Sequence, residues 1–247
     1  MTQKGSGGTF MANHRISIAQ LKNHFTYSWW KYLLLLVLGC FGVDLLFTTT
    51  AYSPPEEKKI ELYLCSSYAD AVAIQEVFWP LLQERCPEQE ELTVMNINLS
   101  SDDIYAQMQF STYVAAQQGD VCLLPRSEFK KLIQDGADSA FLELTPYIDS
   151  GVIDTGDIDL SAGRARSEAG EEGLYGIPAD TLYGLLEYSC DPADSILCIM
   201  AYSGNNDTAA VMADILLEEL CTGKPEGYDE MRAAKKASEQ SSTQIFK

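Results

Sequence analysis

A single apolar stretch near the start of the chain constrains its structure more than any other feature. Between Tyr32 and Phe47 the only charged residue is Asp44. With its aromatic and threonine flanks included, the stretch reaches about 20 residues, which is the length that a helix needs to cross the hydrocarbon core of a bilayer. Aromatic residues at both ends are typical of membrane interfaces. The sequence therefore predicts one transmembrane helix over residues 29–50.

Cys40 lies inside this stretch and raises an alternative. It follows Val37-Leu38-Gly39, so the segment resembles the cleavage and acylation site of a lipoprotein. A signal peptide has a short basic start and polar sequence after the cut, whereas here a long arm precedes the stretch and apolar residues continue to Phe47. We favour a retained anchor over a lipoprotein. Asp44 is interpreted as an interfacial carboxylate, with a polar contact to a partner helix as the alternative.

The charges before this helix predict its orientation. Basic residues without any acidic ones precede Asp44, at Lys4, Arg15, Lys22 and Lys31. By the positive-inside tendency, this side stays in the cytoplasm and the main domain is extracytoplasmic, in a single-pass protein of the cell membrane. Residues 1–28 are expected to form a cytoplasmic arm that contains an amphipathic helix.

The charge of the remaining chain limits its partners. The net charge is −19, and the arm contributes +4, so the part from Asp44 onward carries −23. Such a charge repels nucleic acids and anionic lipids. The sequence therefore argues against a nucleic-acid or lipid-headgroup function and suits a solvated external domain.

The external part predicts an α/β domain with a parallel or mixed sheet flanked by helices. A linker with two prolines, residues 51–58, precedes the domain, which covers residues 59–222. Residues 223–247 are predicted to be a polar tail with one short helix near residues 231–238 and a disordered end. Strands are expected to alternate with helices, which favours parallel strands. The predicted strands are 59–65, 91–98 and 120–125, and the predicted helices are 66–85, with a kink or an end near Pro80, 100–119 and 126–137.

In an open parallel sheet, ligands bind beyond the carboxyl ends of the strands. This rule selects polar residues after each of the three strands as candidate ligand contacts. The alternative is that the serines cap the helices that follow and that the tyrosine packs on the sheet. These residues are Ser66, Ser67 and Tyr68, then Asn98 and Ser100, and finally Pro125 and Arg126.

Three segments resemble extracellular solute-binding proteins of ABC importers: "GDVCLLPRSEFKKLIQDGADSAFLELTPYIDSG" (119–151), "GLYGIPADTLYGLLEY" (173–188) and "ILCIMAYSGNNDTAAVMADILLEEL" (196–220). The resemblance implies a periplasmic-binding-protein-like fold of class II and a role in solute uptake. The chain departs from this family between residues 189 and 195, where members carry most of the second lobe. The resemblance therefore implies a strongly reduced second lobe.

The second of these segments supplies further candidate ligand contacts. Pro178 cannot donate a ladder hydrogen bond, so regular strand pairing should end there. The family crosses between its lobes at this point, which would place Asp180 and Thr181 at the cleft mouth, with Tyr175 and Tyr183 nearby as stacking faces. The alternative is that Asp180 caps a turn and both tyrosines fill the core.

Other chemistry is disfavoured by the residues present. Both histidines, His14 and His24, lie in the arm, so the external domain lacks the imidazole of a Ser/His/Asp or Cys/His site. "SEFK" (127–130) matches a common tetrapeptide, and we expect no enzyme activity. Residues 149–163 gather four aspartates without EF-hand spacing, so we expect a solvated loop, no metal and no cofactor. The six external cysteines are expected to pack in the core, with disulfides as the alternative.

Two functions from different classes follow. The first is a membrane-anchored binding module for a small polar solute, with sugar-like solutes favoured and ABC permease subunits as possible partners. The second is a non-transporting interaction or scaffold protein that keeps the fold and docks on a membrane partner.

Overall fold

The computed structural model describes residues 18–50, 52, 54–65, 68–99, 103–134, 136–234 and 237, without the side chains of residues 18–28. It divides into two units, Met1–Ser53 and Pro54–Lys247, which are described separately.

The first unit contains one long helix, α1 (Ile18–Thr50). Its segment Trp29–Thr50 has 22 residues and a mean hydropathy of 2.0, so length and composition suffice to cross a membrane. Its large apolar side chains are exposed rather than packed into a core. The predicted amphipathic helix of the arm and the predicted membrane helix form one continuous α1, because no proline interrupts residues 18–50. Residues 1–17 lie outside the described part of the chain.

The second unit is built on a five-stranded sheet with the order β2-β1-β3-β7-β6. Strands β1 (Lys59–Leu64), β2 (Glu91–Asn96) and β3 (Val121–Pro125) pair in parallel, as the sequence predicted. Strand β7 (Ser195–Ile199) runs antiparallel to β3, and the short β6 (Ile177–Pro178) runs antiparallel to β7. The sheet is therefore mixed, and β6 points in the same direction as β1 and β3.

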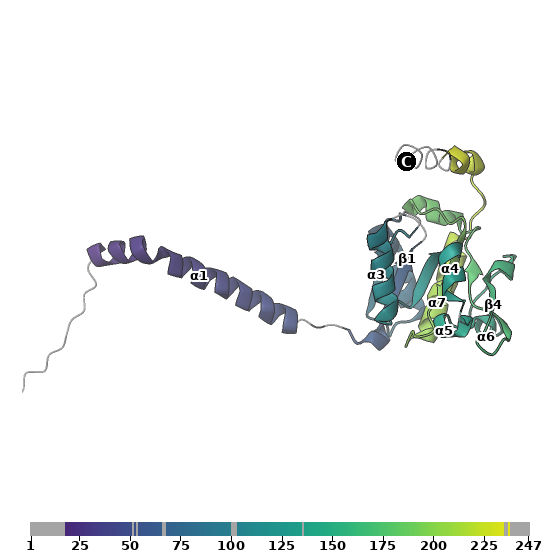
Figure 1. Ribbon diagram of the computed structural model, residues 1–247, viewed down its shortest axis with the longest axis horizontal. Helices are drawn as coiled ribbons and strands as arrows, with labels where there is room; N and C mark the ends of the chain where they lie inside the picture. The colour runs from purple at the N-terminus through teal and green to yellow at the C-terminus, as the bar shows by residue number, and fades with distance from the viewer. Residues whose placement is uncertain are drawn as a thin grey trace, which may run out of the picture. The chain divides into compact units, whose positions relative to one another are not determined.

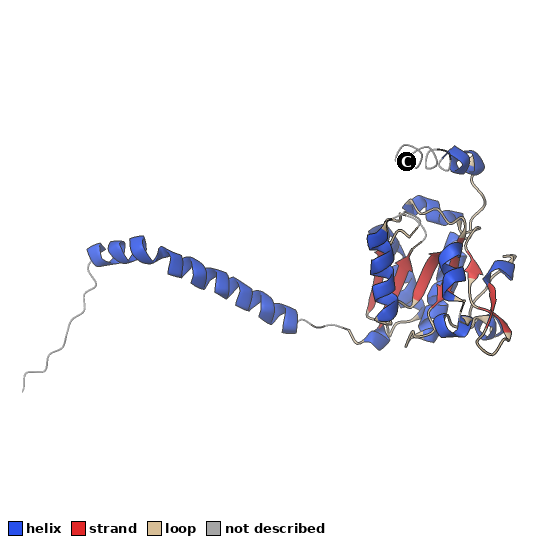
Figure 2. Cartoon of the chain, viewed as in Figure 1, coloured by secondary structure: helices blue, strands red, loops and turns tan. Residues whose placement is uncertain are grey.

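Helices cover both faces of this sheet (Figures 1 and 2). Helices α2 (Ala71–Arg85) and α7 (Asn206–Leu220) pack on one face, where they share a core with the alternate residues Ile60, Leu62 and Leu64. Helices α3 (Ile104–Ala115), α4 (Arg126–Leu132) and α5 (Ala137–Ala140) pack on the other face around Tyr63 and Cys122. The period-two alternation of the strands thus supplies two cores, one for each helical layer.

The remaining elements are short. Between α5 and β7 the chain forms α6 (Thr145–Asp149), the 3-10 helices η2 (Leu160–Gly163) and η3 (Tyr183–Tyr188), and a two-stranded hairpin of β4 (Arg164–Arg166) and β5 (Glu172–Leu174). A further 3-10 helix, η1 (Glu56–Lys58), precedes β1.

Several predicted helix boundaries were wrong. Helix α2 begins after Asp70, whose side chain accepts a hydrogen bond from the backbone N–H of Ala73, and α3 begins after Asp103, which caps it in the same way. Aspartates rather than serines therefore cap both helices. Helix α2 also continues through Pro80, because the exposed side of a packed helix tolerates one missing hydrogen bond.

The polar tail contains a short helix, as predicted, but it also contacts the domain. Residues 223–234 are not a free tail, because Tyr228 is 5% exposed and packs on the domain. Residues 228–234 form a helical segment, and residues 235–236 and 238–247 lie outside the described part. Tyr228, an aromatic residue among polar neighbours, contacts the ring of Tyr183 and the carboxylate of Asp191.

The cysteines are thiols in the structure. Five of the six in the second unit are buried, and Cys221 is exposed. Burial raises the pKa of the Cys122 thiol, which lies in a core layer with Cys65 and Cys198. These small side chains fill the core beneath α3 and α4.

Candidate functional site

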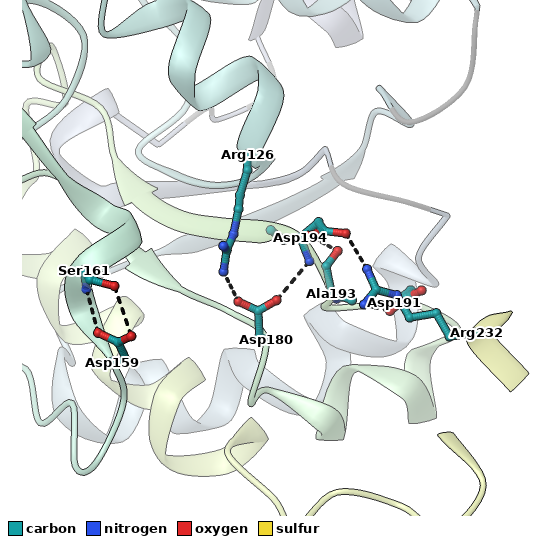
Figure 3. A network of polar contacts seen from close by, with 9 residues as sticks. Arg126, Asp159, Ser161, Asp180, Asp191, Ala193, Asp194 and Arg232 are labelled. Carbon is teal, nitrogen blue, oxygen red and sulfur yellow. Dashed lines mark hydrogen bonds and ion pairs between the residues drawn. The ribbon is translucent and has the colours of Figure 1, made fainter. Parts of the chain in front are cut away.

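The carboxyl ends of β1, β2, β3 and β6 meet at one edge of the sheet, together with the start of β7. Arg126 follows β3 directly, and Asp180 follows β6 after Ala179. The two residues are 54 positions apart in the chain, yet their side chains form an ion pair. Figure 3 shows this pair bridging the two segments. The sheet order brings them together, because β3 and β6 both flank β7.

The ion pair is held by the chain segment that leads into β7. The second carboxylate oxygen of Asp180 accepts a hydrogen bond of 3.1 Å from the backbone N–H of Asp194. The backbone N–H of Arg126 donates to the carbonyl oxygen of Asp194 at 2.8 Å. Both residues of the pair therefore contact the same stretch of backbone, which fixes their positions relative to the sheet.

The pair retains unused hydrogen-bonding capacity. The side chains of Arg126 and Asp180 are 33% and 40% exposed, so both are reachable from solvent. Among the described residues, Nε of Arg126 and Oγ1 of Thr181 are buried and make no hydrogen bond within the protein. Buried polar groups usually have a partner, so these two atoms are exceptions to the rule.

A second carboxylate, that of Asp159, is also influenced by the positive charge of Arg126. Asp159 caps η2, where its oxygens accept hydrogen bonds of 3.0 Å from both the N–H and the hydroxyl of Ser161. These donors lower the pKa of Asp159, and the positive charge of Arg126 adds to the effect. Asp159 therefore stays ionised near Arg126 (Figure 3).

The other predicted contacts are distributed differently. Tyr175 is 3% exposed and belongs to the core around β3 and β7, so its alternative interpretation as a core residue fits its position. Tyr183 lies on η3, and Tyr68 is 63% exposed after β1. Asn98 is half-buried after β2. Ser66, Ser67 and Ser100 lie outside the described residues.

The sequence analysis missed a second layer of charged residues at this edge. The hydroxyl of Tyr228 donates to Asp191 at 2.7 Å, and Arg232 pairs with Asp194. The sequence pattern that could have indicated these contacts is two acidic residues in the turn before β7 and basic and aromatic residues in the tail. They were overlooked because the tail was not expected to contact the domain.

The opposite edge of the sheet contains another network that the sequence analysis missed. Glu61 and Asp120, each less than a tenth exposed, lie at the amino ends of β1 and β3. Glu61 accepts hydrogen bonds from the Tyr63 hydroxyl at 2.8 Å and from the Gly119 N–H at 2.9 Å. Asp120 accepts from the Glu61 N–H at 2.8 Å and from the Ser203 hydroxyl at 2.6 Å. A charged residue inside the apolar run "KIELYL" was the signal for it.

Burial acts on these two carboxylates with opposite net results. Burial alone would raise the pKa of Glu61, but donation from Lys59, Tyr63 and Gly119 outweighs it and lowers the pKa. Burial dominates at Asp120 and raises its pKa, although the Ser203 hydroxyl opposes the shift. A cavity of about 290 Å³ adjoins the pair. Because the network is internally satisfied, we assign it a structural role.

The aspartates of residues 149–163 do not form a metal site in the structure. Asp154 accepts from the backbone N–H of Gly156 at 2.9 Å, and Asp159 caps η2. Within the described ranges, no group of three or more histidine, cysteine, aspartate or glutamate side chains is arranged to hold a metal ion. Asp154 and Asp157 instead line a cavity of about 390 Å³ beside the end of α7.

No family model matches the sequence, and no curated protein matches it. One similar solved structure is an extracellular solute-binding protein of family 1 from Alicyclobacillus acidocaldarius, with 16% identity and a TM-score of 0.35. The match covers 49% of this chain and 28% of that chain, so this chain spans less than a third of the neighbour's length. A similarity this low carries no argument about function.

Proposed function

We propose that this protein is a membrane-anchored, extracytoplasmic binding module for a small polar solute, resembling the substrate-binding component of an ABC importer. The observation that carries the proposal is the half-buried Arg126–Asp180 ion pair at the carboxyl edge of the sheet, with unpartnered polar atoms beside it. The three sequence segments that resemble solute-binding proteins support the same class.

The chemistry of the pair favours a solute with several hydroxyl groups. A guanidinium offers only donors and an ionised carboxylate only acceptors, so together they can satisfy both sides of a hydroxyl group. A solute oxygen could accept from the partly exposed guanidinium of Arg126 while a neighbouring hydroxyl donates to Asp180. Thr181 adds a group that can do either. A sugar-like molecule presents this pattern, which is why we favour it.

The anchor and its orientation are part of the proposal. Trp29–Thr50 would cross the membrane, the basic arm would remain in the cytoplasm, and the acidic domain would face outward. The role we propose is binding without catalysis, because both histidines precede the domain. Permease subunits of an importer are the proposed partners.

A thermal-shift screen tests the proposal directly. The full chain in lipid nanodiscs would be heated with sugars, oligosaccharides, amino acids and peptides. A solute at a hundred times its dissociation constant should add about 2.7 kcal/mol to the free energy of unfolding. The absence of a shift at millimolar concentrations across the whole panel would contradict the proposal.

Replacing Asp180 by alanine locates the site. If Asp180 bonds to the solute, the variant should lose about 1.5–3 kcal/mol of binding free energy, measured by calorimetry. Its loss of stability should be about 1 kcal/mol, because the ion pair is partly solvated. The matched control is Glu172→Ala, which removes the exposed Arg166–Glu172 pair on the hairpin and should leave affinity unchanged. An unchanged affinity of the Asp180→Ala variant would mean that the solute does not bind at this edge of the sheet.

A second candidate function is a non-transporting interaction or scaffold protein that docks on a membrane partner. It is favoured by apolar side chains on α3, where Ile104, Tyr105 and Met108 are 69%, 80% and 62% exposed. A photo-crosslinking residue at position 105 should then capture a membrane protein, whereas one at the exposed position 172 should not. Capture at position 105 without any thermal shift would favour this function over solute binding.

A further inference from the structure

Residues 223–234 follow the end of α7 and return to the edge that holds the candidate site. Tyr228 is the only residue of this segment that is buried, at 5% exposure. Its ring meets the ring of Tyr183 edge-on, with a centroid separation of 5.2 Å. Its hydroxyl donates to Asp191 at 2.7 Å. The segment therefore covers one of the predicted ligand contacts, Tyr183, with an aromatic ring of its own.

A second contact links this segment to the ion pair. Arg232 pairs with the carboxylate of Asp194, whose backbone N–H donates to Asp180. Asp180 in turn pairs with Arg126. The ion pair of the tail and the ion pair of the candidate site are thus joined by one backbone hydrogen bond, as Figure 3 shows.

The segment is held by few contacts. Apart from Tyr228 and the half-buried Arg232, its residues are exposed. Lys224 pairs with Asp229 inside the segment, at 2.6 Å, and so does not fasten it to the domain. Segments with few buried contacts open locally at low free energy, while the core of the domain stays folded.

We propose that residues 223–234 are a latch on the solute site. In the closed state Tyr228 covers Tyr183 and donates a hydrogen bond to Asp191, and Arg232 forms an ion pair with Asp194. In the open state these three groups are released to the solute, beside Arg126 and Asp180. The inference rests on the proposed function, since it concerns the regulation of the same site. Solute and latch compete, so solute binds the open fraction of the molecules and its apparent affinity is reduced by that fraction.

Hydrogen exchange tests the latch without any solute. The full chain would be compared with Arg232→Gln, which removes the pair with Asp194, and with Tyr228→Phe, which keeps the ring but removes the bond to Asp191. Exchange in residues 223–234 should accelerate up to about fivefold in the first variant and about tenfold in the second. Strands β1 and β3 should exchange as before. The matched control Arg166→Gln removes an exposed pair on the hairpin and should change none of these segments.

Two exchange results would overturn the latch. In the first, neither variant changes exchange in residues 223–234, which means that these contacts do not hold the segment. In the second, β1 and β3 accelerate together with the segment, which means that it unfolds only with the whole domain.

Measuring solute affinity distinguishes a failure of the latch from a failure of the proposed function. With a solute found in the thermal screen, each variant should bind more tightly, by the same factor by which its exchange accelerates, because both measurements report the open fraction. Equal or weaker binding, together with accelerated exchange, would show that the segment does not cover the site and would overturn the latch. If no solute binds any of the proteins, the proposed function fails, and the exchange experiment still decides whether the segment opens as a separate unit.

Discussion

Two buried carboxylates, Glu61 and Asp120, lie next to each other at the amino ends of β1 and β3. The pKa of Glu61 is lowered by its donors, including Lys59, whereas the pKa of Asp120 is raised by burial. Asp120 accepts from a backbone N–H and a hydroxyl, and none of the ion pairs among the described residues includes it. As the pH falls, the ionised Glu61 therefore loses a stabilising contribution to the free energy of unfolding, whereas the protonation of Asp120 adds one.

This difference predicts a pH dependence for Asp120→Asn. A carboxyl whose pKa is raised by folding binds more protons in the folded state, so it stabilises below the unfolded pKa of about 3.9. That contribution is lost as the pH rises through the raised value. Asparagine can keep both hydrogen bonds, because the Ser203 hydroxyl can rotate to accept. We expect the free energy of unfolding of the variant, relative to the parent, to rise between pH 4 and neutrality.

Urea unfolding at a series of pH values measures this difference. Comparing the variant with its parent cancels the contributions of the other carboxylates. A difference that does not vary with pH would mean that Asp120 titrates as it does in the unfolded chain.

Gly119 lies at the same edge, next to Asp120. Its φ of +95° is one that other residues adopt with strain, and an added Cβ would lie 2.8 Å from the ring of Tyr63. We expect Gly119→Ala to destabilise by about 1–3 kcal/mol. Gly151→Ala is the control, because that glycine has a φ of +75° but open space around its Cβ position. If both variants lose the same free energy of unfolding in denaturant, the effect at Gly119 comes from the backbone conformation and not from the Tyr63 ring.

At the scale of the elements, α2 shows how packing can override a local signal. Pro80 removes one backbone hydrogen bond from the middle of the helix and disfavours the turn before it. The helix nonetheless continues to Arg85, because Ile74, Phe78 and Leu82 are buried against the sheet on both sides of the proline. Tertiary contacts along the buried face therefore maintain the helix.

Replacing the exposed Pro80 by alanine should stabilise the domain. The change restores a donor and a good helix former without altering the core, so the gain should be about 1–3 kcal/mol. Thermal or denaturant unfolding checks the value, with Glu84→Ala, an exposed change in the same helix, as the control. A loss of stability would mean that the proline ring makes a contact that the helix requires.

At the scale of the whole molecule, the protein combines an apolar helix with an acidic α/β domain. The helix segment Trp29–Thr50 is long enough to remain as an anchor, and Cys40 lies within it. Cleavage before Cys40 would leave apolar residues through Phe47 at the new amino end. We therefore propose that the helix is retained.

Intact mass spectrometry of the membrane-extracted protein decides between these forms. We predict a chain that still carries the residues before Cys40 and no diacylglyceryl group. Cys40→Ser should leave the membrane fraction unchanged, because the helix rather than a lipid holds the protein. A mature chain that begins with a lipid-modified Cys40 would contradict the anchor and the orientation inferred from the basic arm.

Local patterns in the sequence determined much of the secondary structure. The three parallel strands and the helices between them follow from apolar alternation and capping residues, which act within a few positions of the chain. The long apolar helix follows from composition alone. The cap at Asp70 was not predicted, because the neighbouring serines carry an equal local signal.

Only the tertiary structure decided which polar residues meet. Arg126 and Asp180 were selected separately from the ends of their strands, but their ion pair depends on the antiparallel β7 lying between β3 and β6. Tyr175 was selected beside them and is buried, because the direction of a side chain depends on strand register. The return of Tyr228 onto Tyr183 joins residues 45 positions apart in the chain. Local sequence cannot determine such contacts, because their free energy arises only after the sheet has brought distant segments together.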